Sequence, residues 1–196
     1  MKIGVLALQG DFAEHIAMLQ RMGVETRQVR LAGQLDDLDG LIIPGGESTT
    51  IGKLAEEFGL IEPLQRFGQD NAIWGTCAGA IFLSTDVRRQ QPLLGLMDIT
   101  VERNAFGRQV ESFEIDIEVP ALQKVDPENH PYHAVFIRAP LIESVHGSAQ
   151  TLATLPDGTI VAAQEGHWLA TSFHPELTGD DRFHRYFLSM VGQSGT

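Results

Sequence analysis

The sequence predicts an α/β fold, a three-layer sandwich in which a mostly parallel sheet lies between two layers of helices. In the first half of the chain, apolar strand-like runs alternate with helix-like segments, the pattern of a parallel sheet covered on both faces. The chain has 196 residues, of which 43% are hydrophobic. That length supports one well-buried core and is too short for two. We therefore expect a single domain over residues 1–196.

Apolar runs mark the strands expected in the first half, at 2–8, 24–29, 41–43 and 72–74. A helix is expected over 11–22, where Phe12, Ile16 and Leu19 recur at helical spacing behind Asp11, which we take as its N-cap. A second helix is expected from about residue 49 to residue 58. Each of these helices follows a strand, as a parallel sheet requires.

The second half is richer in strands. Residues 110–119 alternate in places between apolar and polar, as a half-exposed strand does. Strands at 151–155 and 159–163 flank a Pro-Asp-Gly turn, which predicts a hairpin. A further strand is expected at 168–173 and a final helix at 180–190. The stretch 119–132 contains three prolines and predicts a long loop.

Charge and cysteine content exclude several classes of function. Acidic residues outnumber basic ones by 26 to 14, giving a formal charge of −12, which argues against binding nucleic acid or an anionic membrane. No segment approaches membrane-spanning length. The one cysteine excludes an internal disulfide framework and fits a reducing compartment. We therefore expect a cytoplasmic protein.

That cysteine, Cys77, is the strongest signal in the chain. It stands in a Gly-Thr-Cys-Ala-Gly segment directly after the apolar run 72–74. A strand that leads into Gly-x-nucleophile-x-Gly is typical of a nucleophile elbow, a strained strand-to-helix turn that exposes one reactive side chain. The start of a helix also favours the thiolate. The alternative, a buried core cysteine, is disfavoured by the two glycines and by the partners below.

His174 and Glu176 are the expected partners of Cys77. His174 directly follows an apolar run, so it should emerge where a strand ends, at the sheet edge where open α/β folds bind ligands. Pro175 favours an extended conformation for His174, and residues two apart in an extended segment face the same way. The carboxylate of Glu176 can then orient the imidazole, which completes a Cys-His-acid triad.

The other six histidines are expected at the surface or in loops: His15, His130, His133, His146, His167 and His184. The short gap between His130 and His133 could suggest a metal pair. Their proline-rich surroundings offer no obvious further ligands, so no metal site is expected.

A glycine-rich loop supplies a candidate oxyanion hole. Residues 44–50, Pro-Gly-Gly-Glu-Ser-Thr-Thr, follow the strand 41–43 and should lie at the same sheet edge as Cys77. The N–H groups of Gly46 and Ala78 are the candidate donors. The segment lacks the Gly-Lys-Ser/Thr ending of a phosphate-binding loop. An ordinary strand-to-helix loop remains the alternative for this segment alone.

The elbow, the loop at 44–49 and the His-Pro-Glu at 174–176 together resemble the class I, triad-type glutamine amidotransferases. Further segments narrow the resemblance to the glutaminase subunit of pyridoxal 5′-phosphate synthase. These are Leu-Gln-Gly at 8–10 followed by Glu-His at 14–15, Val-Glu-Arg-Asn-Ala-Phe-Gly-Arg-Gln at 101–109 and Phe-Ile-Arg-Ala-Pro at 136–140. The resemblance implies a flavodoxin-like class I glutamine amidotransferase fold and one glutaminase domain.

The resemblance also implies an activity and its residues. Cys77 would attack the side-chain amide of L-glutamine to form a thioester, and L-glutamate and ammonia would be released. Gly46, Glu47, Ser48, Arg103, Ile137 and Arg138 would bind the glutamine; Arg108 has no assigned role. The ammonia would pass to a (β/α)8-barrel synthase subunit within a large hetero-oligomer, and the chain itself would need no cofactor. We also expect that Gln9 helps set the oxyanion loop when the partner docks.

Two alternatives to this interpretation stay open at the level of sequence. The chain could be a glutaminase that serves another synthase, or a hydrolase on the same scaffold. It could also be a non-catalytic, redox-sensing binding module in which Cys77 is merely oxidised.

Overall fold

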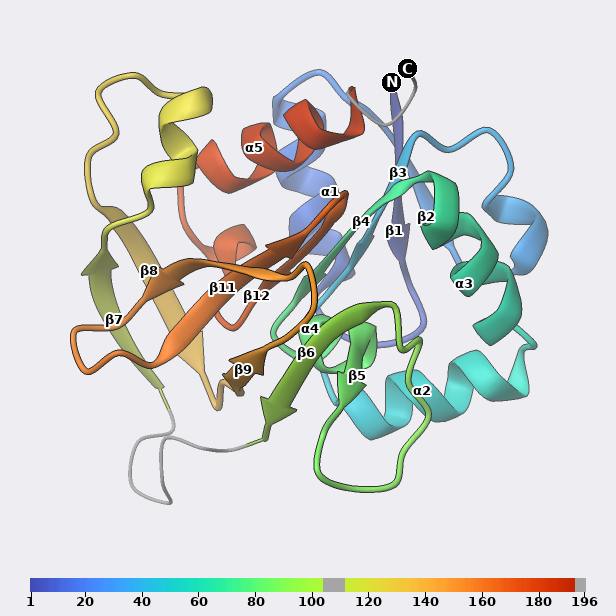
Figure 1. Ribbon diagram of the computed structural model, residues 1–196. Coiled ribbons are helices and arrows are strands. Elements are labelled where there is room, and N and C mark those ends of the chain that lie inside the picture. The colour runs from blue at the N-terminus through green and yellow to red at the C-terminus, as the bar shows by residue number, and fades with distance from the viewer. Residues whose placement is uncertain (104–111, 193–196) are drawn as a thin grey trace.

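The computed structural model describes residues 1–103 and 112–192, which form helices on both faces of one large sheet (Figure 1). The first half of the chain supplies alternating strands and helices. Its elements are β1 (Lys2–Leu6), α1 (Phe12–Arg21), β2 (Glu25–Val29), η1 (Ala32–Gln34), β3 (Gly40–Ile43), α2 (Ser48–Glu57), α3 (Ile61–Asp70), β4 (Ala72–Thr76) and α4 (Ala78–Leu83).

Strands dominate the second half. Its elements are β5 (Ser84–Asp86), β6 (Met97–Glu102), β7 (Ser112–Ile117), η2 (Pro120–Lys124), β8 (Tyr132–Ile137), β9 (Leu141–Val145), β10 (Gln150–Thr154), β11 (Ile160–Glu165), β12 (Trp168–Thr171), η3 (Pro175–Leu177) and α5 (Arg182–Val191). None of the helices in the described ranges has the length and apolar character needed to cross a membrane.

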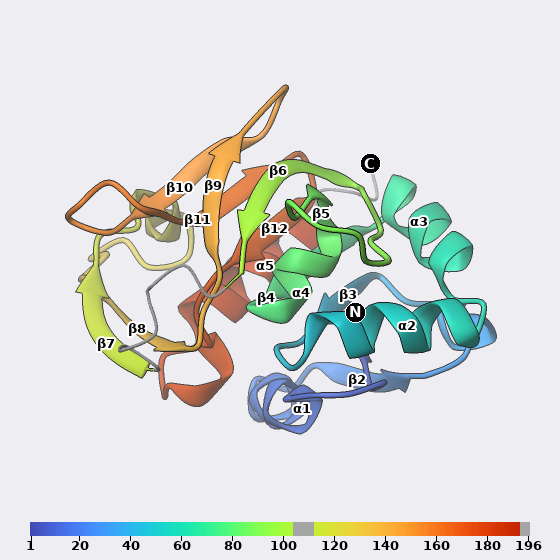
Figure 2. The same cartoon turned by 90° about the horizontal axis from the view of Figure 1, so that it is seen from below.

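The central sheet changes character along its strand order, β2-β1-β3-β4-β12-β11-β9-β6-β5. Strands β2, β1, β3, β4 and β12 are parallel neighbours. From β12 onward the pairings with β11, β9 and β6 are antiparallel, and β10 pairs with β11 as the predicted hairpin. Strands β7 and β8 form a separate ribbon, which lies at the opposite end of the molecule from α2 and α3 (Figure 2).

Two hydrophobic clusters cover the two faces of the sheet, which gives the predicted three layers. Side chains of α1 and α5 pack with Ile42 and Trp74 on one face. Side chains of α2, α3 and α4 pack with Ile43 and Ile73 on the other. The alternation of neighbours between the clusters follows from the period of two in a strand. Strands that are buried on both faces have continuous apolar sequences, and for that reason the sequence pattern predicts them.

The structure adds elements that the sequence pattern did not reveal. Helix α3 is one of them, with Leu64 buried and with Ile61 and Phe67 packed against the same cluster. Strands β5, β6 and β9 are others, and they extend the sheet beyond β11. The predicted loop at 119–132 contains the short helix η2. Asp11 does stand at the N-cap of α1, but its side chain makes no capping hydrogen bond.

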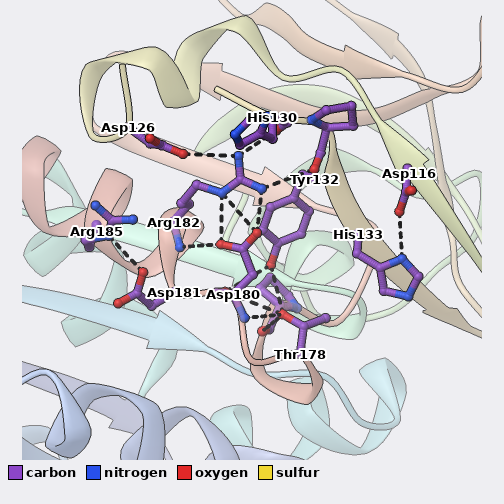
Figure 3. A network of polar contacts seen from close by, with 12 residues as sticks. Asp116, Asp126, His130, Tyr132, His133, Thr178, Asp180, Asp181, Arg182 and Arg185 are labelled. Atoms are coloured by element: carbon purple, nitrogen blue, oxygen red, sulfur yellow. Dashed lines mark hydrogen bonds and ion pairs between the residues drawn. The ribbon is translucent and has the colours of Figure 1, made fainter. Parts of the chain in front are cut away.

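A buried arginine fastens α5 to the segment that precedes β8 (Figure 3). The guanidinium of Arg182 donates to both carboxylate oxygens of Asp180, and also to the carbonyl oxygens of His130 and Pro131 at 2.6 and 3.2 Å. Tyr132 completes the contact, since its ring lies 5.4 Å from the guanidinium carbon and its hydroxyl lies near Thr178 and Asp180. This cluster therefore holds the chain that follows Glu176.

We predict that Arg182→Met lowers the free energy of unfolding by about 3 kcal/mol, because it leaves the Asp180 carboxylate without its buried partner. Arg185→Met is the matched control on the same helix. Arg185 pairs with Asp181 at the surface, where such pairs contribute about 0–1 kcal/mol, and donates to the carbonyl oxygen of Val125 at 2.7 Å, so its loss should cost less than that of Arg182. Urea denaturation of both variants measures the difference; equal losses would contradict the structural role given to Arg182.

Candidate active site

Four parallel strands end at one edge of the sheet and carry the residues singled out in the sequence. The loops after β1, β3, β4 and β12 meet there because these strands are neighbours and run in the same direction. The pairing of β4 with β12 aligns Thr76 with Thr171. The segments that contain Cys77 and His174 therefore leave the sheet side by side, although they lie far apart in the sequence.

Cys77 occupies a strained strand-to-helix turn between β4 and α4. Its backbone is left-handed, with φ 49° and ψ −108°, a conformation that non-glycine residues rarely adopt. Its N–H donates to the carbonyl oxygen of Thr171 at 2.8 Å, which ties the turn to β12. The turn also brings α4 against β3. A Cβ at Gly79 would lie 1.9 Å from the carbonyl oxygen of Ile43, so only glycine fits there.

His174 lies against Cys77 and is held from two sides. Its N–H donates to the carbonyl oxygen of Val135 in β8 at 2.9 Å, and its Nδ1 lies 2.6 Å from Oε1 of Glu176. Burial alone would lower the pKa of His174, but hydrogen bonds and charge interactions with Cys77 and Glu176 outweigh it and raise the pKa to about 10. The resting site therefore favours an imidazolium in contact with the sulfur of Cys77.

Glu176 is buried, with a side chain that solvent does not reach. Burial raises its pKa, and the hydrogen bond from His174 opposes that effect. Asp11, which is partly exposed, approaches the same ring nitrogen, with Oδ2 3.7 Å from Nδ1 of His174. Two carboxylates thus approach one nitrogen of the imidazole, and the buried one makes the short contact.

The same three residues, Asp11, His174 and Glu176, are the group in the described part of the chain whose ligand atoms are close enough to hold a metal ion, within 4.8 Å of one another. The Nδ1 atom of His174 would have to serve as the ligand. That atom instead makes the short contact with Glu176. Since a protonated imidazole has no free lone pair, this geometry favours a relay of hydrogen bonds over metal binding.

The glycine-rich loop after β3 is fixed by the loop after β1. Oε1 of Gln9 accepts a hydrogen bond from the N–H of Glu47 at 2.7 Å, and the N–H of Asp11 donates to the carbonyl oxygen of Gly45 at 3.1 Å. Gly10 allows this approach, because it has φ +100° and a Cβ there would lie 1.8 Å from the carbonyl oxygen of Gly45. The orientation of the peptide between Gly45 and Gly46 is therefore set from the loop at 8–11.

Glu47 begins helix α2 and is paired with Arg103. Its carboxylate accepts from the N–H groups of Thr49 and Thr50, and Nη2 of Arg103 lies 3.0 Å from its Oε1. Slight burial raises the pKa of Glu47, but the hydrogen bonds with Thr50 and Thr49 prevail and lower it to about 2. Two residues expected to bind glutamine thus contact each other in this structure.

The remaining predicted substrate residues surround the same edge. Ser48 is buried at the start of α2, and its hydroxyl lies 3.4 Å from the side-chain nitrogen of Gln91. Ile137, at the end of β8, is 37% exposed. Arg138 follows it with an exposed side chain and a left-handed backbone, φ 42°. Arg108 and the rest of the 104–111 segment lie outside the described residues.

The expectation that all six other histidines lie at the surface or in loops is wrong for two of them. His15 and His184 are fully buried, on α1 and α5. They lie on helix faces that also carry Leu19 and Phe187, and the helical spacing of those residues is the signal that could have placed them in the core. The expectation fits the exposed pair His130 and His133, which contact different carboxylates: His130 contacts Glu128, and His133 contacts Asp116 and Glu114.

Comparisons with known proteins agree with this geometry. A family model described as the SNO glutamine amidotransferase family matches residues 5–193. The pyridoxal 5′-phosphate synthase subunit PdxT of Herpetosiphon aurantiacus is 58% identical over 195 residues, which cover 97% of this chain and 100% of the relative. The PdxT subunit of Moorella thermoacetica is 54% identical and covers 98% and 100%.

Solved structures give the same result for the fold. A crystal structure of a glutamine amidotransferase superposes with a TM-score of 0.90 at 49% identity and covers 97% of this chain and 98% of that one. A chain of PurLQS from Thermotoga maritima superposes with a TM-score of 0.67 at 15% identity, over 98% and 95% of the two chains, which is a likeness of fold. The predicted fold class and the resemblance seen in the sequence motifs are thus confirmed. The chain belongs to the SNO glutamine amidotransferase family.

Proposed function

We propose that this chain hydrolyses L-glutamine to L-glutamate and ammonia and supplies the ammonia to the synthase subunit of pyridoxal 5′-phosphate synthase. The observation that carries the proposal is the contact of Cys77 with a His174–Glu176 pair at the sheet edge, in a chain of this family. The destination of the ammonia is inferred from the relatives, which are named as subunits of pyridoxal 5′-phosphate synthase. Residues 1–196 act as one glutaminase domain in this proposal.

The reaction follows from the protonation state of the resting site. The sulfur of Cys77 adds to the side-chain carbonyl carbon of glutamine, and the imidazolium of His174 then gives its proton to the departing nitrogen, so that ammonia leaves and a thioester remains. His174, now neutral, takes a proton from water, whose oxygen adds to the thioester carbon. Collapse of this adduct frees the sulfur beside the imidazolium of His174, which restores the resting site, and glutamate leaves as its carboxyl proton passes to water. Glu176 orients His174 and stabilises its charge throughout.

Charge that develops on the carbonyl oxygen needs hydrogen-bond donors. Ala78 follows the nucleophile and is the first residue of α4, so its N–H is not used within the helix. The N–H of Gly46 is the second donor that we assign. Its peptide is oriented through Gly45 and Asp11, while Gln9 holds the next N–H along the loop. A shift of the 8–11 loop would therefore change where the Gly46 N–H points.

Free glutamine carries a carboxylate and an ammonium group, which need opposite charges in the site. The exposed guanidinium of Arg138 is free of ion pairs among the described residues and suits the carboxylate. Glu47 suits the ammonium group, and Ser48 and Ile137 are the further residues that we assign to glutamine binding. Arg103 neutralises Glu47 in the resting structure, so binding of glutamine would rearrange this pair.

Ammonia requires a partner at close range. Released into neutral water it becomes ammonium and loses its nucleophilicity, so transfer along a protected route favours docking to the synthase. The partner in this proposal is a (β/α)8-barrel subunit within a large hetero-oligomer. Leu177, which directly follows Glu176, is 45% exposed and gives the site an apolar residue at its surface.

The alternatives left open by the sequence are less well supported. Service to another synthase would not match the relatives, which are named as subunits of pyridoxal 5′-phosphate synthase. A redox-sensing module would need neither an imidazolium in contact with Cys77 nor a buried carboxylate behind it.

We predict that Cys77→Ala abolishes glutaminase activity measured with the synthase subunit present, because no other nucleophile replaces the sulfur. Glu176→Gln should lower kcat by about 100-fold or more, since the imidazolium loses its counter-charge. His130→Gln, at an exposed histidine far from this chemistry, serves as the control and should keep full activity. Release of glutamate with and without the synthase subunit is the measurement; activity in Cys77→Ala would rule out the proposal.

We predict that His174 stays protonated up to about pH 10 in the resting subunit. A raised pKa means that the charged form persists above the ordinary value of 6.5, and Cys77→Ala should lower that pKa because it removes one of the interactions that raise it. NMR titration of labelled histidine measures both. A wild-type His174 that titrates near pH 6.5 would contradict this prediction.

We predict that Gln9→Ala lowers partner-stimulated kcat by about tenfold, because the loop that carries Gly46 loses its hydrogen bond to Gln9. Gln20→Ala, which removes an exposed glutamine from α1, is the matched control. Glutaminase activity with the synthase subunit is compared for the two variants. Unchanged activity in Gln9→Ala would remove Gln9 from the mechanism.

A further inference from the structure

The polar contacts of the site continue behind Glu176 into the core. Oε1 of Glu176 contacts His174, whereas Oε2 is buried and has no aligned hydrogen-bond donor. The Nε2 atom of His15 lies 3.3 Å from Oε2, and solvent reaches neither side chain. An ionised carboxylate in such a place needs donors on both oxygens, because burial penalises its charge.

His15 belongs to a string that links both helices on this face of the sheet. Its Nδ1 lies 3.0 Å from Nε2 of His184 on α5, and its Nε2 lies 3.2 Å from Oγ1 of Thr76, the residue before Cys77. Trp74 packs edge-on against both imidazoles, at ring separations of 5.6 and 4.9 Å. The two rings are thus fixed in the core and open to no solvent.

The two histidines carry one ring proton each. Burial lowers the pKa of His15 well below its ordinary value, and burial also lowers that of His184, to about 3. The contact between Nδ1 of His15 and Nε2 of His184 allows two arrangements of the ring protons. In the first, His15 donates from Nδ1, and its unprotonated Nε2 lies against the carboxylate of Glu176, which is repulsive. It also leaves a buried N–H on Nδ1 of His184, which has no partner. Buried N–H groups without partners are rare in proteins.

In the second arrangement, the N–H group of each imidazole has an acceptor within reach. His184 donates from Nε2 to Nδ1 of His15, and His15 then has its proton on Nε2, which lies 3.2 Å from Oγ1 of Thr76 and 3.3 Å from Oε2 of Glu176. The atom left without a partner is the unprotonated Nδ1 of His184. No buried N–H is orphaned.

We propose that His15 is a positioning residue of the active site, which donates its Nε2–H to Glu176 and so keeps that carboxylate ionised and aimed at His174. His184 fixes the tautomer of His15. The inference rests on the proposed function for its catalytic consequence, but not for its effect on the charge of Glu176.

The other charged groups around Glu176 do not replace His15. His174 occupies the opposite oxygen, and Asp11 beside it is itself acidic and disfavours a second negative charge. Tyr132 lies near enough for the charge of Glu176 to help raise the pKa of its hydroxyl, an effect smaller than that of burial, and Arg182 beyond it is paired with Asp180. Arg21, which faces His184, disfavours a positive charge there.

The test compares His15→Leu with His15→Gln in the isolated chain. Leucine removes the donor at similar size, whereas the side-chain nitrogen of glutamine can replace Nε2. Since Cys77 is the only cysteine, alkylation by iodoacetamide followed by mass spectrometry reports on this site alone. With the donor lost, Glu176 is protonated at higher pH and no longer supports the imidazolium beside the sulfur.

We expect His15→Leu to slow alkylation of Cys77 at pH 6 by about tenfold, the loss typical of one hydrogen bond to a charged group. The deficit should be smaller at pH 9 than at pH 6, because a higher pH favours the ionised form of Glu176. His15→Gln should restore the rate at pH 6. With glutamine and the synthase subunit present, the acidic limb of the pH profile of kcat should move to higher pH in His15→Leu, while KM stays unchanged.

A purely structural role would slow both variants equally at both pH values, and that result, or an unchanged rate at pH 6 in His15→Leu, would overturn the inference. If His15→Leu does not fold, His184→Leu and His184→Gln repeat the comparison one step along the string, with the same sign expected. Wild type that alkylates as described but releases no glutamate with the synthase would overturn the proposed function and leave this inference standing.

Discussion

The site depends on the parallel pairing of β4 with β12. This pairing aligns Thr76 with Thr171, and the N–H of Cys77 donates to the carbonyl oxygen of Thr171. The nucleophile and the segment that carries His174 therefore leave the sheet as neighbours. Parallel neighbours cannot be joined by a tight turn, so the residues between them supply α4, the antiparallel strands and the β7–β8 ribbon. One register shift between β4 and β12 would separate sulfur from imidazole.

Side chains around the site are paired with one another in this structure. Glu47 caps α2 and pairs with Arg103, and Gln9 holds the loop that carries Gly46. The carboxylate of Glu47 is therefore neutralised by Arg103, and the glycine-rich loop is tied to the loop after β1. In the proposed function, binding of glutamine would have to open the pair of Glu47 and Arg103.

Local sequence predicted the parts of the site that depend on local structure. The glycines around Cys77 fix the turn, and the spacing of His174 and Glu176 puts both on one short segment, so these features follow from neighbours in the chain. The contacts that it missed join distant elements. His15 and His184 come from helices at the two ends of the chain, and a histidine that is buried gives the same sequence signal as one that is exposed unless its helix face is considered. Strands β6 and β9 were missed for a related reason, since they pair with segments far along the chain, whereas the local hairpin of β10 and β11 was predicted.

The buried histidines also explain why this face of the sheet is not entirely apolar. Leucine at either position would fill the space without the cost of burying an imidazole. His15 and His184 instead join α1, the sheet and α5 through Thr76, Glu176 and each other, and these are the elements that surround the triad. Their neutral state matters, because protonation of either imidazole would add a positive charge close to the imidazolium of His174. If these two positions served packing alone, apolar side chains would suffice. The orientation of the two imidazole rings instead fits the role that we propose, which is to keep the carboxylate of Glu176 ionised.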